Sequence, residues 1–176
     1  MATLVRIDTK RLILRTVTME DIDEVAASWK LYEGPISLEE ARGRVDWMMG
    51  NHEQNGPGRL VHLCLAIIDK NSQELIGWCG LDHLDQTKEN PALFYLLKEC
   101  FWGRGLATEA ARAVLDYAFR ELRLPRIDSG AAFENAASKR VMEKIGMQYL
   151  GIDKEGGHAF TMTREAYLES LNCSSV

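Results

Sequence analysis

The stretch that decides the fold is Trp102-Gly103-Arg104-Gly105-Leu106-Ala107-Thr108-Glu109-Ala110. Before it, residues 93–97 form an apolar run long enough for a buried strand, and after it apolar residues recur at helical spacing as far as Leu122. The predicted order is therefore a strand, a glycine-rich turn and a helix, with the helix extending over residues 104–122.

The glycine-rich turn has the properties of an anion-binding site. The first N–H groups of the following helix lack partners within the helix, and the helix dipole adds partial positive charge at the same end. Gly103 and Gly105 carry no side chains that would keep a ligand away. A phosphate or pyrophosphate is the expected ligand. The alternative is that the two glycines only shape a tight turn.

Two familiar phosphate-binding motifs do not fit this turn. The dinucleotide-binding fingerprint needs a third small residue where Thr108 or Glu109 stands. The P-loop needs Gly-Lys-Ser/Thr, which the chain lacks.

Length and composition are those of one globular domain. The chain has 176 residues, 46% of them hydrophobic and 27% charged, which allows one substantial core. The net charge of −5 includes no basic block, so nucleic acid is not an expected partner. This charge is compatible with a cationic substrate.

The cysteines and the apolar runs indicate a cytoplasmic protein that does not contact a membrane. None of the four cysteines shows CxxC spacing, so reduced thiols and no metal site are expected. The start of the chain is basic and has no apolar segment of signal-peptide length. The longest apolar run, residues 63–68, is too short to span a bilayer.

Taken in order, the pattern predicts one α/β domain over residues 1–176, with a mixed sheet of about seven strands and four to five helices. The strand–helix–strand unit around the glycine turn favours parallel pairing with a right-handed crossover. Residues 172–176 are expected to be a frayed tail. Strands are predicted over residues 12–15, 60–69, 74–84, 93–97, 126–133, 147–152 and 158–163, and helices from Thr18 to residue 33 and over 38–52, 104–122, 135–145 and 164–171.

At this point the chain resembles the GNAT-type N-acetyltransferases, and within them the RimJ/RimL branch that acetylates protein N-termini. The match covers nearly the whole chain in the right order. Residues 9–15 resemble the opening strand of that branch, and 102–110 resemble its coenzyme A motif. Leu75-Ile76-Gly77 with Gly80-Leu81 resembles the central hairpin, and Asn135-Ala136-Ala137-Ser138 with residues 143–147 resembles the later family motif.

The resemblance implies a sheet whose two middle strands splay apart, with the pantetheine of acetyl-CoA in the gap and its pyrophosphate on the N–H groups of residues 103–108. Acetyl-CoA would be a cosubstrate, without a metal. The oxyanion donor would be a backbone N–H near Leu97 or Lys98. The implied cofactor-binding residues are Leu96, Leu97, Trp102, Gly103, Arg104, Gly105, Leu106, Ala107, Thr108, Asn135 and Ser138.

The chain departs from the wider family at the position of the proton donor. Many relatives carry a tyrosine seven residues after the equivalent of Asn135, but here that position is Met142, which cannot donate a proton. Ser138 lies one helical turn earlier on the same face and is the candidate catalytic residue. The alternatives are that Ser138 only supports the helix cap, that Asn135 is only the N-cap, and that water protonates the thiolate.

The general base is not assigned by any motif. Many relatives carry a glutamate three residues before the tyrosine that matches Tyr95, and here that position is Ala92. Glu33, Asp82 and His83 are candidates because they fall where the acceptor should enter, although each could equally be a solvated residue at a loop or strand end.

The resemblance predicts transfer of an acetyl group to a primary amine by direct attack in a ternary complex. An α-amine with a pKa of about 8 suits a site without a strong base better than a lysine amine at about 10.4. The acceptor could be a protein N-terminus or a small amine, and the enzyme could be a homodimer. The alternatives are a coenzyme A-binding module that has lost catalysis, and a scaffold with a vestigial glycine turn.

Overall fold

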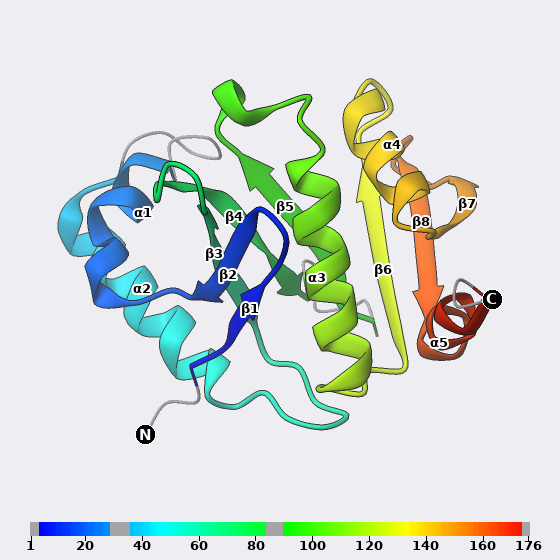
Figure 1. Ribbon diagram of the computed structural model, residues 1–176, viewed down its shortest axis with the longest axis horizontal. Helices are drawn as coiled ribbons and strands as arrows, with labels where there is room; N and C mark the ends of the chain where they lie inside the picture. The colour runs from blue at the N-terminus through cyan, green and yellow to red at the C-terminus, as the bar shows by residue number, and fades with distance from the viewer. Residues whose placement is uncertain (1–3, 29–35, 84–89, 174–176) are drawn as a thin grey trace.

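The computed structural model describes residues 4–28, 36–83 and 90–173 as one layered α/β domain (Figure 1). Its sheet has eight strands in the order β1-β2-β3-β4-β5-β6-β8-β7. The strands are β1 (Arg6–Asp8), β2 (Leu12–Thr16), β3 (Leu63–Asp69), β4 (Leu75–Asp82), β5 (Ala92–Leu97), β6 (Arg126–Ala131), β7 (Gln148–Ile152) and β8 (His158–Thr163). The helices are α1 (Ile22–Ser28), α2 (Leu38–His52), α3 (Leu106–Arg120), α4 (Ala136–Lys144) and α5 (Arg164–Cys173).

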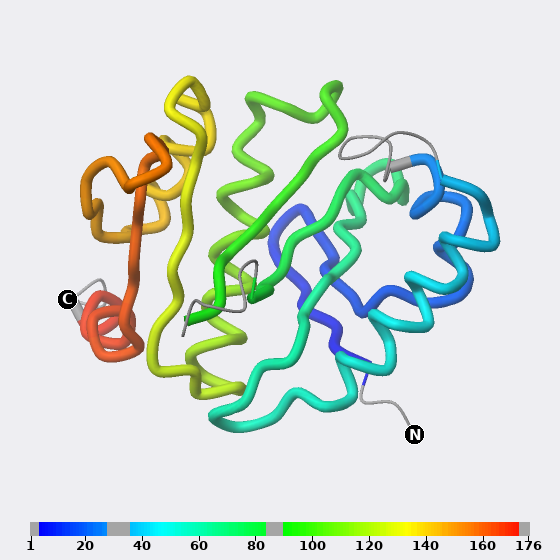
Figure 2. The backbone as a smooth tube through the Cα atoms, turned by 180° about the vertical axis from the view of Figure 1, so that it is seen from behind, coloured from blue at the N-terminus to red at the C-terminus, as the bar shows by residue number. Residues whose placement is uncertain are grey.

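Helices cover both faces of the sheet because the strands are apolar on both sides. Leu65 and Leu93 belong to the larger core, which α3 completes with Ala110, Val114 and other residues of its apolar stripe. The alternate strand residues, such as Ala66 and Trp78, pack with α1 and α2 in a second cluster. Figure 2 shows α1 and α2 beside the β3–β4 half of the sheet, with β6 and β8 at the other end.

The sheet opens between β5 and β6, the only parallel pair among the described strands. These strands pair at a single position, Ala92 with Asp128, and then diverge with α3 lying across the opening (Figure 1). The side chain of Ser129 donates a hydrogen bond to the carbonyl of Leu93 at 3.0 Å, and it marks the last contact before the strands separate. The predicted mixed sheet with splayed middle strands is confirmed.

Several predicted boundaries were wrong by a few residues. The helix after the glycine turn begins at Leu106 instead of Arg104, because Gly103 and Gly105 have φ values of 72° and 74° that no helix accommodates. Strand β1 was not predicted, because three residues are too few to show an alternating pattern. Helix α5 continues two residues beyond Leu171 to Cys173, so the start of the expected frayed tail is helical. Residues 174–176 lie outside the described residues.

None of the helices in the described ranges is long and apolar enough to cross a membrane.

Glu109 in the first turn of α3 connects this helix to the β1–β2 hairpin. Its carboxylate accepts hydrogen bonds from the Thr9 hydroxyl at 2.6 Å, the Arg11 backbone N–H at 2.8 Å and the Arg11 Nε at 2.7 Å. The Arg11 guanidinium also donates to the Arg104 carbonyl at 2.8 Å, within the glycine turn. The start of the chain therefore holds the turn and the helix in one arrangement.

We expect Glu109→Gln to destabilise the fold in a pH-dependent way. Burial acts to raise the pKa of Glu109, but hydrogen bonds from Thr9 and Arg11 outweigh it and hold the pKa below its usual value. A carboxyl with a lowered pKa stabilises the fold above its unfolded-state pKa, and this contribution is lost as pH falls through the folded-state pKa. The variant should lose about 1–2 kcal/mol at pH 7.

Urea denaturation of both proteins, at pH 7 and below about pH 4, measures this difference, which should shrink at the lower pH. Glu143→Gln, at an exposed position on α4, is the control. A stability loss that is the same at both pH values would contradict the role given to the Glu109 carboxylate.

Candidate active site

The glycine turn presents the open end of α3. Gly105 is the N-cap of the helix in the left-handed conformation, and no side chain caps the helix there. A side chain at Gly103 would meet no atom within 4 Å, so the space beside the turn is open. The unpaired N–H groups of the first helical turn can therefore bond to an anion.

A cavity of about 270 Å³ lies between this turn, β5 and α4. It contains all but two of the residues predicted to bind the cofactor: its lining includes Leu96, Leu97, Trp102, Gly103, Gly105, Leu106, Ala107, Asn135 and Ser138. The two exceptions are Arg104, whose guanidinium lies 5.3 Å from the centre of the Phe101 ring, and Thr108, which is buried in α3.

The hydrogen-bond pattern of β5 turns part of its backbone toward the cavity. The N–H of Lys98 donates to the carbonyl of Ile76 on the neighbouring hairpin at 2.8 Å. Because bonding directions alternate along an antiparallel strand, the N–H groups of Tyr95 and Leu97 point away from β4, toward the gap. Of the two predicted oxyanion donors, Lys98 is therefore already engaged and Leu97 faces the cavity.

The end of β5 is closed by Trp102. Its indole Nε1 donates to the Leu97 carbonyl at 2.8 Å, which satisfies an acceptor that the splayed sheet leaves unpaired. The rest of this residue is exposed, with 60% of its surface accessible.

Helix α4 brings Ser138 to the same cavity. Asn135 caps the helix, its side chain accepting the Ser138 N–H at 3.0 Å, as the sequence predicts. Met142, one turn later, is buried in the larger core. It lines neither this cavity nor the larger one on the other side of Ser138. Ser138 is half-buried and lines this cavity.

Tyr95 is a site residue that sequence reasoning did not assign. Its hydroxyl crosses the gap from β5 and donates to the backbone carbonyl of Ser138 at 3.1 Å. Burial raises the pKa of Tyr95, so its phenol remains protonated at neutral pH. The alternation of β5 could have indicated that Tyr95 faces the coenzyme side, but only the fold shows that it meets α4.

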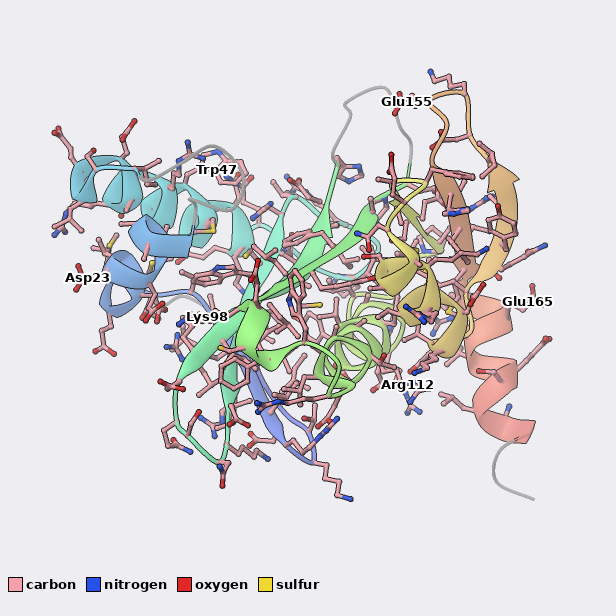
Figure 3. The ribbon with its side chains drawn as sticks, turned by 90° about the horizontal axis from the view of Figure 1, so that it is seen from above. Asp23, Trp47, Lys98, Arg112, Glu155 and Glu165 are labelled. Atoms are coloured by element: carbon pink, nitrogen blue, oxygen red, sulfur yellow. The ribbon has the colours of Figure 1, made fainter. Side chains whose placement is uncertain are left out.

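A second cavity of about 810 Å³ lies on the other side of this contact, between β5, β6 and the β7–β8 loop. Tyr95 and Ser138 line both cavities, so the two meet at these residues. Four carboxylates and no Lys or Arg are found in the described part of its lining: Asp128, Glu134, Asp153 and Glu155. Figure 3 labels Glu155 at the tip of the β7–β8 loop and Arg112 of α3 away from it.

The residues predicted as candidates for the general base differ in where the structure places them. Ala92, which stands where relatives carry a glutamate, lines the second cavity. Asp82 ends β4 directly opposite Ala92, and His83 follows it, half-buried. Glu33 lies outside the described residues. Across the described parts of the chain, no group of His, Cys, Asp and Glu could hold a metal ion.

Residues 11–148 match the family model described as the acetyltransferase (GNAT) domain. The chain belongs to the GNAT acetyltransferase family. The protein named uncharacterized N-acetyltransferase p20, from Bacillus licheniformis, is 28% identical over 171 residues that cover 93% of each chain. The predicted family and enzyme class are therefore confirmed.

Two solved GNAT structures share the fold at low identity. The ribosomal-protein-S5-alanine acetyltransferase of Vibrio fischeri has a TM-score of 0.78 at 17% identity, over 93% of this chain and 98% of that one. RimL, a ribosomal α-N-protein acetyltransferase in complex with coenzyme A, has a TM-score of 0.76 at 17% identity, over 92% and 99%. Both likenesses show the shared fold.

We expect Gly103→Glu to weaken coenzyme A binding at least tenfold, about 1.4 kcal/mol, because a carboxylate beside the turn would repel a pyrophosphate. Isothermal titration calorimetry measures the affinity. Gly58→Glu is a matched control, because Gly58 has a φ of 75° against 72° for Gly103 and is equally uncrowded. Both variants carry the same backbone strain, so equal affinities in the two would show that coenzyme A does not use this turn.

Proposed function

We propose that this protein is an acetyl-CoA-dependent N-acetyltransferase that transfers the acetyl group to a primary amine. The observation that carries the proposal is the meeting of the two cavities at Tyr95 and Ser138. The smaller cavity has the glycine turn and inward-facing backbone that suit a pantetheine and pyrophosphate. The larger one has room for an acceptor that reaches the same point from the other side.

In this arrangement both substrates are held together, so that attack is effectively intramolecular. The amine attacks the thioester carbonyl, the C–N bond forms and the C–S bond breaks. The Leu97 N–H, which faces the gap, would stabilise the developing oxyanion. The pyrophosphate would lie on the turn from Gly103 to Thr108, with Arg104 contributing only its backbone.

The departing thiolate needs a proton, and two hydroxyl groups are placed to supply it. Ser138 was the predicted donor, and it lines the point where the cavities meet. Tyr95 lies at the same point, and its phenol is a stronger acid than a serine hydroxyl. We propose that one of these two hydroxyl groups donates its proton directly to the sulfur.

The acceptor is proposed to be a cationic amine, because the charged residues in the described lining of the larger cavity are all carboxylates. A protein N-terminus is the first acceptor to test, since the names of RimL and the Vibrio fischeri enzyme describe ribosomal-protein acetylation. A small amine is the second candidate acceptor, because a small molecule with two or more positive charges would pair with the same carboxylates.

Thiol release from acetyl-CoA, followed with a panel of N-terminal peptides and small amines, tests this function. We expect release that depends on both acetyl-CoA and an amine. The alternative is a coenzyme A-binding module without catalysis, which the loss of the usual tyrosine at Met142 and glutamate at Ala92 would favour. Binding of coenzyme A without thiol release for any amine would support that alternative.

Ser138→Ala and Tyr95→Phe should each lower kcat with little change in the KM for acetyl-CoA, because a proton donor acts mainly in the transition state. One lost interaction of this kind predicts a fall of roughly tenfold to several hundredfold. Ser170→Ala, at an exposed position on α5, should keep the wild-type rate. Steady-state kinetics and denaturation on the same preparations separate catalysis from stability.

If Ser138 only supports the helix cap, its variant will lose about 0.5–1 kcal/mol of stability and keep its turnover. An unchanged kcat in both variants would leave water as the proton source.

A further inference from the structure

His62 is a buried polar residue whose bonding is incomplete. It immediately precedes β3, and only 8% of its side chain is exposed. Its Nε2 has no hydrogen-bond partner among the described residues. Its Nδ1 lies 3.4 Å from the Asp82 Oδ1, close enough for an ion pair but not aligned as a hydrogen bond. Buried polar atoms without partners are rare, so this imidazole calls for an explanation.

The strand register places His62 close to the larger cavity. Leu63 pairs with Leu81, so His62 is opposite Asp82, and Asp82 pairs in turn with Ala92. These residues share the face of the sheet that α2 covers, where the Trp47 ring lies 4.7 Å from the His62 ring. Trp47 marks this side of the molecule in Figure 3. His62 is therefore behind Asp82, and Asp82 is beside a residue of the cavity wall.

Asp82 is exposed where His62 is not. Its side chain keeps 32% of its surface accessible, and directly opposed residues have Cβ atoms about 4.5–5.5 Å apart. Ala92, which lines the larger cavity, carries only a methyl group and is the strand partner of Asp82. The part-exposed Asp82 carboxylate therefore lies between this cavity wall and the buried His62 ring.

We propose that Asp82 and His62 form a two-residue proton relay that deprotonates the acceptor amine before it attacks acetyl-CoA. This inference rests on the proposed function, since it assumes that the larger cavity holds the amine. It assigns the base that sequence motifs leave open, and it adds His62, which no motif indicates.

Each proton that the acceptor amine loses has an identified destination. The acceptor arrives as an ammonium, and one of its N–H bonds breaks as the proton passes to the Asp82 carboxylate and on to the Nδ1 of His62, in the neutral tautomer whose ring proton is on Nε2. The amine becomes neutral and the imidazole becomes imidazolium. After attack, the second amine proton replaces the one that Tyr95 or Ser138 gives to the thiolate, and His62 releases its proton to solvent through Asp82. The net products are amide, thiol and one free proton.

Water carries the proton over the distance between the relay and the reacting atoms. Tyr95 follows Ala92 by three residues, about 10 Å along a strand. A cavity of about 810 Å³ lined by carboxylates has room and partners for bridging waters along this path.

The charges around the pair favour this direction of transfer. The adjacent His62 imidazole holds the pKa of Asp82 below its usual range, against the effect of burial, so Asp82 is an ionised carboxylate at neutral pH. His83, next along the chain, also faces Asp82 and acts in the same direction. On β3, burial first and Asp82 second raise the pKa of the Cys64 thiol to about 12, so this neighbour stays neutral.

The test compares the pH dependence of kcat/KM in the wild type, His62→Gln and Asp82→Asn, from about pH 6 to about pH 9.5. With a strongly basic amine, the wild type should level off below the pKa of the amine. The variants should be at least tenfold slower near pH 7 and should approach the wild type at high pH, where the amine loses its proton without help. With a weakly basic amine that is already neutral at pH 7, the deficit should disappear.

His52→Gln is the matched control, because His52 is another buried histidine, at the end of α2. It should lose stability but keep the wild-type pH profile. A deficit of equal size at every pH and with both amines would show that His62 and Asp82 are only structural, and would overturn the inference while leaving the proposed function intact. A wild-type protein that releases no thiol with any amine would overturn both.

Discussion

The separation of β5 from β6 is the constraint on which the rest of the structure depends. Parallel strands that part after a single pairing leave backbone N–H and C=O groups without partners, and burying such groups is costly. In this protein side chains take over some of them: Ser129 bonds to the Leu93 carbonyl, and Trp102 bonds to the Leu97 carbonyl. The N–H groups that remain face a cavity, where a ligand can bond to them.

The open sheet is held in shape from outside the gap. Glu109 attaches α3 to the hairpin at the start of the chain, and Tyr95 attaches β5 to α4 across the gap. The Tyr95 contact crosses the gap where strand pairing cannot, and the Glu109 contacts fix α3 to the β1–β2 side of the sheet. They also place the glycine turn, whose open space would have little use without a fixed helix behind it.

The two faces of the sheet differ in the residues that they present. On one face α3 packs into the larger core, with residues such as Ala110 and Val114 fully buried. On the other face polar residues appear in neighbouring positions across the strands, from His62 through Asp82 and past Ala92 to Asp128. Ala92, the small residue in this row, leaves room at the edge of the larger cavity. The carboxylates of that cavity and the base proposed for the reaction are therefore on the same side.

The amino-acid sequence by itself determined the order of the elements, the glycine turn at the start of α3, the Asn135 cap and the family. Each of these follows from residues close together in the chain, where hydrophobic spacing and capping chemistry act locally. Together with the family resemblance, these local signals identified most of the residues that line the smaller cavity. The predicted helix included Arg104, but the positive φ angles of the flanking glycines exclude this residue from the helix.

Only the tertiary structure decided which of these residues meet. Thr9 and Glu109 are 100 residues apart in the chain, and Tyr95 and Ser138 are 43 apart, so no local pattern relates them. Strand register decided that Leu97, and not Lys98, turns its N–H toward the gap, and that His62 lies behind Asp82. A shift of one residue would have reversed both, because adjacent residues in a strand point in opposite directions. Register depends on the packing of the whole sheet, which the periodicity of a single strand does not contain.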